Sequence, residues 1–257
     1  MTPVALTIAG SDPSGGAGIQ ADLKTFHQHN VYGEAVITLL TVQNTRSVSA
    51  VVPIDPELVT AQLRAVLEDI PPHAAKTGAL GTKSVIEAIA REAAGFRFPL
   101  VVDPVMISKH GTALVADEAR LAIRDLLLPH AALLTPNLHE AAALAGISVE
   151  NKDDMRRAAE KLCALGCKGV LVKGGHLSGP AVDILLVDGA FHEFESERID
   201  TPHTHGTGCT YSAAITAELA KGREVVEAVG RAKGFITRAI KTNPGLGHGS
   251  GPVNHFA

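Results

Sequence analysis

A glycine-rich turn that runs into an apolar helix is the segment most suited to chemistry in this sequence. The stretch THGTGCTYSA at positions 204–213 places Gly206, Thr207 and Gly208 directly before a lone Cys209. Small residues let backbone N–H groups converge, and the first N–H groups of a helix have no partner within the helix. Together with the helix dipole, these groups would form an anion site. The turn therefore predicts phosphoryl transfer, with residues 206–208 stabilising charge on the transferring group.

Cys209 stands where this helix is expected to begin, and its position suggests a role. A helix N-terminus lowers the pKa of a thiol, so a thiolate could take the proton of an acceptor hydroxyl. Phosphoryl transfer depends mainly on positioning and charge stabilisation. A hydrogen-bonding thiol, or a small residue that only lets the backbone approach a phosphate, therefore stays open as an alternative.

The elements that must position this turn alternate between strands and helices. Apolar runs bounded by turn residues predict strands near 4–9, 35–42, 47–54, 74–77, 100–102, 132–134 and 170–172, and a hairpin at 182–194. Helical patterns cover 19–26, 56–70, 84–94, 155–165, 209–220 and 225–240. This order predicts one α/β domain over 1–257, with a mostly parallel sheet between two helix layers and an antiparallel hairpin at one edge. Residues 244–257 form a Gly- and Pro-rich tail.

Several polar residues follow directly after predicted strands: Asp12, Gln43, Lys76, Asp103, Asn137 and Lys173. In open α/β sheets, ligands bind beyond the carboxyl ends of the strands, so these residues should surround one site. The Gln43 amide can donate and accept hydrogen bonds at once, so it can form a bidentate contact with a ligand that presents a donor beside an acceptor.

The glycine-rich segment GSDPSGGAGIQA after the first predicted strand fits two familiar nucleotide motifs poorly. Gly10 and Gly15 have the spacing of a P-loop, but the Lys and Ser/Thr that should follow are missing. A dinucleotide-binding turn also fits, yet Gln43 stands where a ribose-binding acid is expected. A dehydrogenase is therefore a remote alternative.

Composition argues against several kinds of partner. The net charge is −4, and only 2 Tyr and no Trp are present, so no nucleic-acid partner is expected. No stretch reaches the roughly 18 apolar residues of a membrane span. An odd number of cysteines, 3, and the absence of a signal-peptide pattern predict a reduced cytoplasmic protein. The HxH pairs at 27–29 and 203–205 lack an evident third ligand, so surface or hydrogen-bonding roles are expected.

Eight motifs in order give the chain a family resemblance. They are AGSDPSGGAGIQADLKTF (9–26), QNT (43–45), KTG (76–78), DPVM (103–106), TPNLHEA (135–141), VKGGH (172–176), HGTGCTYSAAI (205–215) and GPVNHF (251–256). With these, the chain resembles the hydroxymethylpyrimidine and phosphomethylpyrimidine kinases of thiamine biosynthesis nearly from end to end. The resemblance implies a ribokinase-like fold. It also implies ATP-dependent phosphorylation of 4-amino-5-hydroxymethyl-2-methylpyrimidine and then of its monophosphate in one site.

The resemblance also implies roles for individual residues. The catalytic set is Cys209, Gly206, Thr207 and Gly208. The substrate-binding set is Gln43, Asp22, Gly10 and Val105. The ATP-binding set is Asn137, Lys173, Thr207 and Lys233. Mg²⁺ is assigned to Asp103, through water, and to Glu140, although Asn137 and Glu140 also have the spacing of a helix capping box.

Three further expectations accompany the resemblance. Ala79 stands where this family often has a larger residue such as Met, which leaves room in the pocket. A pyridoxal or pyridoxine kinase of the same fold is the nearest alternative, because both substrates are planar heterocycles with a hydroxymethyl group, and a non-catalytic ligand-binding regulator is a more distant one. The segment Ser108–Thr112 could close over the substrate. The resemblance also leads us to expect a homodimer.

Overall fold

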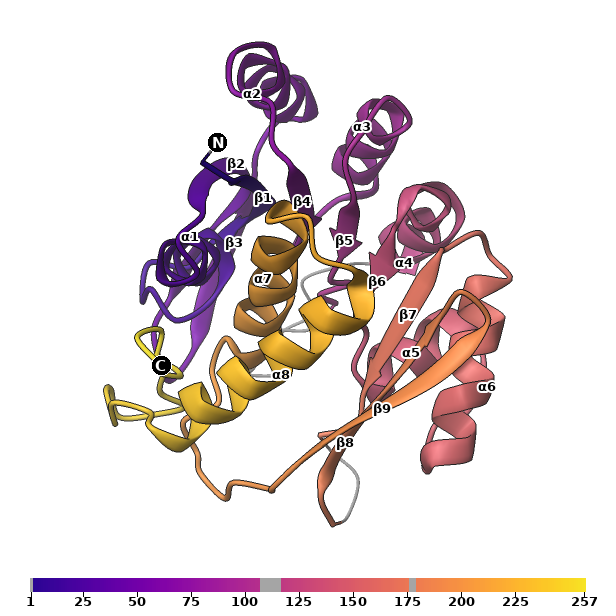
Figure 1. The fold of residues 1–257 in the computed structure, drawn as a ribbon. Helices are drawn as coiled ribbons and strands as arrows, with labels where there is room; N and C mark the ends of the chain where they lie inside the picture. The colour runs from indigo at the N-terminus through magenta and orange to yellow at the C-terminus, as the bar shows by residue number, and fades with distance from the viewer. Residues whose placement is uncertain (1, 107–116, 176–178) are drawn as a thin grey trace.

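The computed structural model describes residues 2–106, 117–175 and 179–257, which form one sheet covered by helices on both faces (Figure 1). Within these ranges the strands are β1 (Val4–Ser11), β2 (Tyr32–Gln43), β3 (Val48–Pro53), β4 (Ala74–Thr77), β5 (Leu100–Val102), β6 (Leu133–Leu134), β7 (Gly169–Lys173), β8 (Ala181–Val187) and β9 (Ala190–Ser196). Their order across the sheet is β3-β2-β1-β4-β5-β6-β7-β8-β9.

The centre of the sheet is parallel and both of its edges are antiparallel. Strands β2, β1, β4, β5, β6 and β7 pair in parallel, and the predicted hairpin forms from β8 and β9. At the other edge β3 also pairs antiparallel with β2, an arrangement that was not predicted from the sequence. Between Gln43 and Val48 the chain is too short for the crossover that a parallel pair requires.

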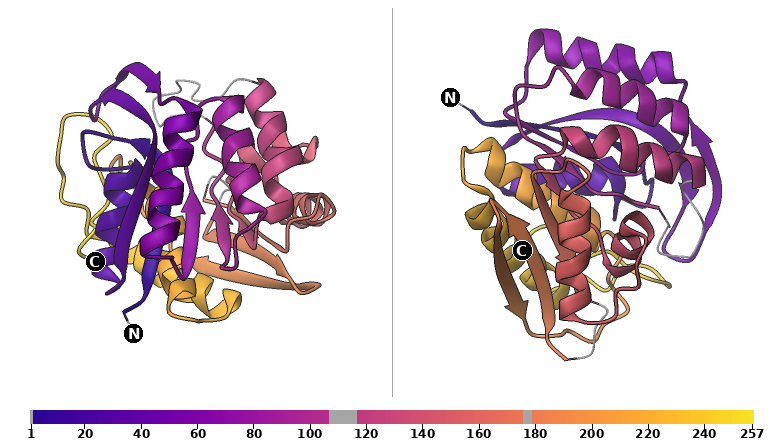
Figure 2. Two further views of the ribbon diagram at one scale, coloured as in Figure 1. Left: turned by 90° about the horizontal axis from the view of Figure 1, so that it is seen from above. Right: turned by 90° about the vertical axis from the view of Figure 1, so that its right-hand side faces the viewer.

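Two helix layers cover the sheet (Figure 2). One face carries α1 (Gly18–Gln28), α7 (Thr207–Ala220) and α8 (Val225–Lys241). The other carries α2 (Pro56–Asp69), α3 (Lys83–Ala93), α4 (Asp117–Ala122), α5 (Leu138–Ala145) and α6 (Lys152–Cys163). Helix α4, which continues into a π-helical turn at Ile123–Leu127, was not anticipated from the apolar pattern.

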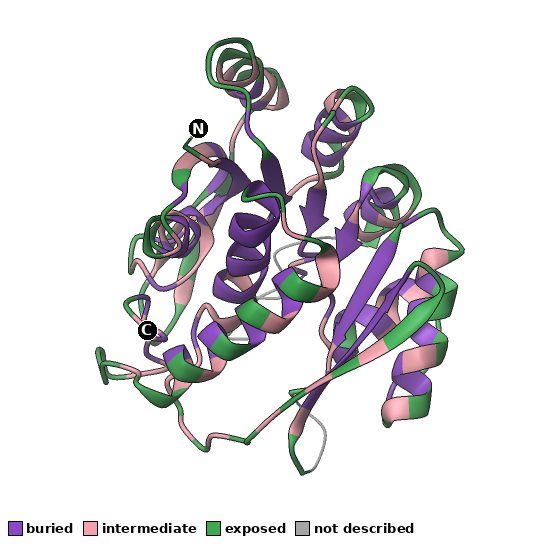
Figure 3. Ribbon diagram, in the orientation of Figure 1, coloured by how far each residue is buried: buried purple, intermediate pink, exposed green. Residues whose placement is uncertain are grey.

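Side chains on the two faces of the sheet pack into two separate apolar clusters, because successive strand residues point to opposite sides. Leu6 and Ile8 of β1 pack toward α2 and α3, whereas Ala5 packs toward α1 and α7. Helix α7 is buried along its length, from Thr210 to Ala220 (Figure 3). The turn that precedes α7 is therefore fixed against the sheet by a fully packed helix.

The parallel strands all end on the same side of the sheet, which is where α7 begins. This arrangement brings the loops after β1, β5, β6 and β7 to one edge. Across the residues that the structure describes, no helix is long and apolar enough to cross a membrane.

Candidate active site

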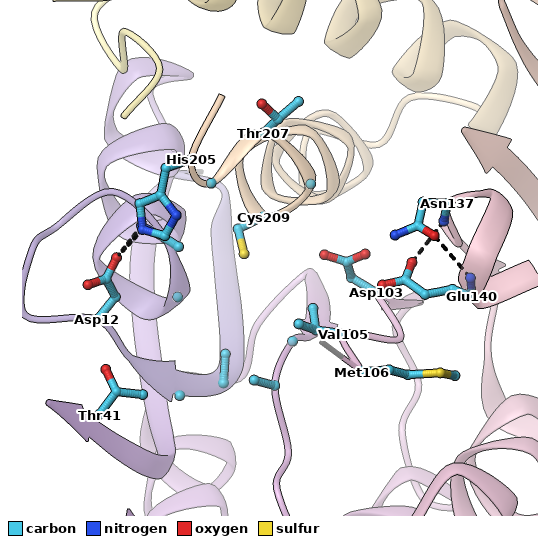
Figure 4. Close-up of a pocket in the computed structure, with 18 of the residues that line it drawn as sticks. Asp12, Thr41, Asp103, Val105, Met106, Asn137, Glu140, His205, Thr207 and Cys209 are labelled. Atoms are coloured by element: carbon cyan, nitrogen blue, oxygen red, sulfur yellow. Dashed lines mark hydrogen bonds and ion pairs between the residues drawn. The ribbon is translucent and has the colours of Figure 1, made fainter. Parts of the chain in front are cut away.

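A cavity of about 590 Å³ lies at this edge, between the strand ends and the start of α7 (Figure 4). The residues predicted from the sequence that line it are Gly10, Asp12, Gln43, Asp103, Val105, Asn137, Glu140, Lys173, Gly206, Thr207, Gly208 and Cys209. Asp22, Lys76 and Lys233 do not line it. The sequence pattern therefore located the site and most of its wall.

The turn before α7 requires glycine at one position, Gly206. Gly206 has a φ of 77°, and a Cβ at this residue would lie 1.7 Å from the carbonyl oxygen of Gly16. Thr207 begins α7, and its Oγ1 donates to a carbonyl oxygen of the same turn at 2.7 Å. A Cβ on Gly208 would lie 3.4 Å from Lys173 Nζ. The glycines thus bring the helix N-terminus against a charged group of the cavity.

Cys209 lies in the first turn of α7 with its Sγ directed into the cavity (Figure 4). Burial raises the pKa of this thiol to about 12, even though the nearby Lys76 ammonium lowers it. The prediction of a pKa lowered by the helix N-terminus was wrong. Loss of water around the sulfur outweighs the helix dipole, because desolvation disfavours the charged form. In the free protein Cys209 is a thiol at neutral pH.

Asp103 and Lys173 form an ion pair on the cavity wall. Lys173 Nζ donates to Asp103 Oδ1 at 3.1 Å, and Thr135 and Ser212 each donate a hydroxyl hydrogen bond to the same carboxylate at 3.3 Å. Burial lowers the pKa of Lys173, but the carboxylates of Asp103 and Glu140 offset this and raise it. Lys173 therefore keeps its positive charge in the cavity, where an anionic group would bind.

Asn137 and Glu140 form the predicted capping box at the start of α5. Glu140 N donates to Asn137 Oδ1 at 3.0 Å, and Asn137 N donates to Glu140 Oε2 at 2.8 Å (Figure 4). Burial raises the pKa of the Glu140 carboxyl to about 7, Lys173 lowers it, and Asp103 raises it further. The capping role is thus confirmed, and both side chains still line the cavity.

Two carboxylates at this wall could hold a magnesium ion together with a phosphate-bearing ligand. Within the described ranges, no cluster of three or more His, Cys, Asp or Glu could hold a metal on its own. Mg²⁺ is usually bound by one or two carboxylates together with substrate phosphates and several waters. Asp103 and Glu140 meet that requirement, with Asp103 buried at the end of β5 and Glu140 beside it at the cavity wall.

Gln43 contributes an amide to the opposite wall of the cavity. Its Oε1 lies 3.3 Å from Thr41 Oγ1, and its Nε2 lies 3.3 Å from His205 Nε2. His205 Nε2 in turn lies 2.7 Å from Asp12 Oδ2, with both side chains 4% exposed (Figure 4). The hydrogen-bonding role expected for this histidine is confirmed. Its link to Gln43 was not anticipated, although its place directly before the glycine turn was a signal.

Asp22 lies beneath the cavity rather than in its wall. Its carboxylate accepts two hydrogen bonds from Lys76 Nζ, both at 2.9 Å, and one from Thr7 Oγ1 at 2.6 Å. Both side chains of the ion pair are fully buried. Asp22 is therefore engaged by protein groups, and Lys76, which has no role assigned from sequence, is the charge that it neutralises. Both residues act electrostatically on Cys209 from below.

Lys233 is held away from the cavity by residues of β8. Its Nζ donates to Asp183 Oδ2 at 2.7 Å and to the Ala181 carbonyl oxygen at 3.0 Å. A contact between Lys233 and a ligand in the main cavity is not supported by this geometry. Two other sequence expectations, the closing segment Ser108–Thr112 and His176 of the VKGGH motif, lie outside the described residues.

Known proteins match this chain over nearly its whole length. The model of the phosphomethylpyrimidine kinase family matches residues 12–254. A hydroxymethylpyrimidine/phosphomethylpyrimidine kinase of Streptomyces coelicolor is 47% identical over 98% of this chain and 94% of its own length. The solved phosphomethylpyrimidine kinase of Clostridium difficile is 47% identical with a TM-score of 0.83, over 92% of this chain and 99% of that one. An ADP complex of a Bacillus subtilis pyridoxal kinase is 46% identical with a TM-score of 0.92, over 99% and 98%.

Proposed function

The chain belongs to the phosphomethylpyrimidine kinase family, and from this premise we propose that it carries out two phosphorylations in thiamine biosynthesis. It transfers the γ-phosphoryl group of ATP to 4-amino-5-hydroxymethyl-2-methylpyrimidine and then to the monophosphate formed. The observation that carries this proposal is the cavity itself. One wall holds an amide suited to an aminopyrimidine, and the other joins a helix N-terminus to the charged Lys173.

The geometry supports specific roles in the transfer step. The acceptor hydroxyl oxygen forms the new P–O bond while the bond between the γ-phosphorus and the ADP oxygen breaks. Backbone N–H groups of residues 206–208 and the Lys173 ammonium stabilise the charge on the transferring group. The hydroxyl proton leaves late, to a phosphoryl oxygen, as a loose transition state permits.

We assign Cys209 as a positioning group for the acceptor rather than as a preformed thiolate base. Its Sγ faces the cavity and its thiol is protonated at neutral pH. The second acceptor is a phosphate oxygen, which already carries negative charge, so that step needs no strong base. A thiol that hydrogen-bonds the acceptor serves both steps.

ATP is the co-substrate, and its triphosphate would lie between Lys173 and the turn at 206–208. Asn137 at the start of α5 lines the same side of the cavity. Asp103 and Glu140 would hold Mg²⁺, largely through water, and the ion would neutralise charge on the β- and γ-phosphates. Lys173 and Asp103 would keep the phosphates and the ion on the side of the cavity away from Gln43.

Kinetics of Gln43→Leu test the proposed substrate. Leucine fills a similar volume but cannot form a hydrogen bond to the aminopyrimidine edge, so the KM for the pyrimidine should rise about 5- to 150-fold, which corresponds to about 1–3 kcal/mol of lost recognition. The KM for ATP should change by less than about twofold, because Gln43 is on the other wall. An equal rise in both KM values would contradict the assignment of Gln43 to the pyrimidine.

Pyridoxal is a second candidate acceptor because of Ala79. This small residue lines the cavity, and its carbonyl oxygen is held by Thr38 Oγ1 at 2.6 Å, which fixes the wall. The similarity to a Bacillus subtilis pyridoxal kinase points the same way. Ala79→Met should reduce any pyridoxal turnover much more than pyrimidine turnover. An equal loss of pyridoxal turnover and pyrimidine turnover would show that Ala79 does not determine the choice of substrate.

The oligomeric state and the compartment stay predictions. We infer a homodimer from the family resemblance, and a cytoplasmic location from the odd number of cysteines and the lack of a signal-peptide pattern. Light scattering coupled to size-exclusion chromatography would measure a mass of twice 26.7 kDa for the dimer. A mass of one chain at micromolar concentration would contradict it.

A further inference from the structure

The chain after α8 returns to the site as an extended stretch, residues 249–255, which we call the C-terminal segment. In Figure 1 it belongs to the yellow trace that ends beside α1. Gly251, Val253 and His255 are buried, while Pro252 and Asn254 between them are partly exposed. This alternation is that of an extended chain packed on one side. Every residue of the C-terminal segment is described, and none of them lines the cavity.

The C-terminal segment holds the residue that directly precedes the glycine turn. His205 N donates to the Gly251 carbonyl oxygen at 3.0 Å, and Val253 N donates to the His205 carbonyl oxygen at 3.3 Å. The two bonds form a parallel bridge between His205 and Pro252. Because His205 is buried, the loss of either bond would leave a buried backbone group without its partner. The backbone that leads into Gly206 is therefore fixed by the C-terminal segment.

The same segment is tied to the loop after β2. Ser250 N donates to the Thr45 carbonyl oxygen at 2.8 Å, and Gly249 N donates to Thr45 Oγ1 at 3.3 Å. A Cβ on Gly249 would overlap that carbonyl oxygen, so this close approach requires glycine. Ser250 Oγ also donates to the Pro202 carbonyl oxygen at 3.0 Å. Ser250 therefore joins the loop that follows Gln43 to the chain that leads into the turn.

Helices α7 and α8 anchor the other end of the C-terminal segment. Asn254 N donates to the Ala239 carbonyl oxygen of α8 at 2.9 Å. Val253 is buried in the apolar cluster that α7 and α8 form on this face of the sheet. His255 is also buried, and its Nε2 lies 3.2 Å from Thr210 Oγ1 in the first turn of α7. The segment thus contacts the chain on both sides of the glycine turn.

These contacts place the C-terminal segment behind the turn rather than beside a ligand. We propose that the segment positions residues 206–208 for phosphoryl transfer, by holding His205 in place relative to the loop after β2. This inference rests on the proposed function, in which residues 206–208 stabilise charge on the transferring group. A misplacement of about 1 Å can lower the rate of a reaction by about 100-fold. The C-terminal segment therefore acts on the transfer step without touching either substrate.

A positioning role of this kind predicts an effect on kcat rather than on KM. Donors at residues 206–208 act on charge that develops during transfer, so their displacement lowers kcat and kcat/KM together. ATP binding should change little, because Lys173 and Asn137 are held by β7 and by the start of α5. A segment that only stabilised the fold would instead lower the melting temperature and leave kcat per folded molecule unchanged.

Gly251→Ala tests the contact with the turn. A Cβ at this residue would overlap His203 Nδ1 and the Leu246 carbonyl oxygen, so the segment must move relative to residues 203–205. We expect kcat to fall by about tenfold or more, with each KM within about threefold of the parent. Phe256→Ala is the matched control, because this side chain directly follows the segment and is 85% exposed. It should keep the kcat of the parent.

Gly249→Ala tests the contact with the loop after β2, and it is independent of the first variant. Its Cβ would overlap the Thr45 carbonyl oxygen and push the segment away from that loop. We expect kcat to fall by about tenfold or more here as well. Circular dichroism measures the folded fraction and the melting temperature of each variant. An unchanged kcat per folded molecule in both variants overturns the inference, whatever happens to the melting temperature.

Hydrogen exchange with mass spectrometry examines the turn without any substrate. The peptide covering residues 204–213 should exchange about tenfold faster or more in Gly251→Ala, and at the parent rate in Phe256→Ala. Unchanged exchange in Gly251→Ala overturns the inference. An assay of the unaltered protein with Mg·ATP and the pyrimidine separates the two levels of the account. No phosphorylated product means that the proposed function fails, whereas product with a kcat indifferent to both glycine substitutions means that only this inference fails.

Discussion

Lys76 Nζ lies 2.9 Å from both carboxylate oxygens of Asp22, and neither side chain reaches solvent. Thr7 Oγ1 donates to the same carboxylate at 2.6 Å. The pair joins β4 to α1 beneath the cavity and places a fixed positive charge under the Cys209 sulfur. Because the Asp22 carboxylate neutralises the Lys76 ammonium, the pair adds no net charge to the floor of the cavity.

The first prediction concerns this pair. Lys76→Met should lower the free energy of unfolding by about 3–5 kcal/mol, because it leaves the Asp22 carboxylate buried without a counter-charge. The double variant Lys76→Met/Asp22→Leu should recover a large part of that loss, since no buried charge remains. Urea unfolding of the three proteins measures both values. A single-variant loss below 1 kcal/mol would show that Asp22 is not held as a buried anion.

A second prediction concerns the protonation of Cys209. Its thiol is the form present up to about pH 12, so alkylation by iodoacetamide should be slow at pH 7 and should accelerate with each pH unit up to pH 10. Mass spectrometry of the Cys209 peptide measures the rate, with the exposed free thiol of N-acetylcysteine as reference. A rate that levels off with a midpoint below pH 8 would restore the thiolate-base role.

A third prediction uses two glycines with the same substitution. Gly208→Val should leave the melting temperature within a few degrees of the parent, because a Cβ there meets Lys173 Nζ only at 3.4 Å. It should lower turnover by roughly 100-fold or more, since the branched side chain occupies the path of the transferring group and displaces its N–H donors. Gly95→Val, at a site remote from the cavity, is the control and should keep full turnover. A near-normal turnover rate in Gly208→Val would contradict the proposed role of residues 206–208 in phosphoryl transfer.

A fourth prediction concerns acid stability at the α1–α7 contact. Burial raises the pKa of Glu218, but hydrogen bonds from Lys221 and His29, both at 2.8 Å, bring it to about 2, below its ordinary 4.5. A carboxyl with a depressed folded-state pKa stabilises the fold above pH 4.5, and this contribution is lost as the pH falls toward 2. Glu218→Gln should therefore be less stable than the parent at pH 7, by up to about 3 kcal/mol, with the difference vanishing near pH 2. Urea midpoints between pH 2 and 7 measure it, and a difference that does not change with pH would contradict the assignment.

Much of the fold could be predicted from the sequence because its signals are local. Period-two and period-3.6 apolar patterns gave the strands and most helices, and the polar residues after strand ends located the cavity. The second antiparallel edge was missed because β2 and β3 carry no hairpin turn motif, so only the short connection decides their pairing. Helix α4 was missed because its six residues are too few to show a clear apolar period.

The wrong predictions at the site depend on burial and on contacts between distant segments, which cannot be derived from the sequence pattern. The pKa of Cys209 depends on how much water surrounds the sulfur, and the position of a residue at the start of a helix does not predict its burial. Asp22 was assigned to the substrate from the family resemblance, whereas the structure pairs it with Lys76, which is 54 residues away in the sequence. Asp12, His205 and Gln43 lie on three distant segments, so the contacts among them exist only once these segments are packed.

The most direct test of the account is a product assay with purified protein. Mg·ATP is supplied with 4-amino-5-hydroxymethyl-2-methylpyrimidine, and separately with pyridoxal, and products are resolved by anion-exchange chromatography. The account predicts the pyrimidine monophosphate first and the pyrimidine diphosphate at its expense, with ADP formed in equal amount to the phosphoryl groups transferred. Pyridoxal phosphate as the sole product, or no product from either compound, would contradict the proposed function.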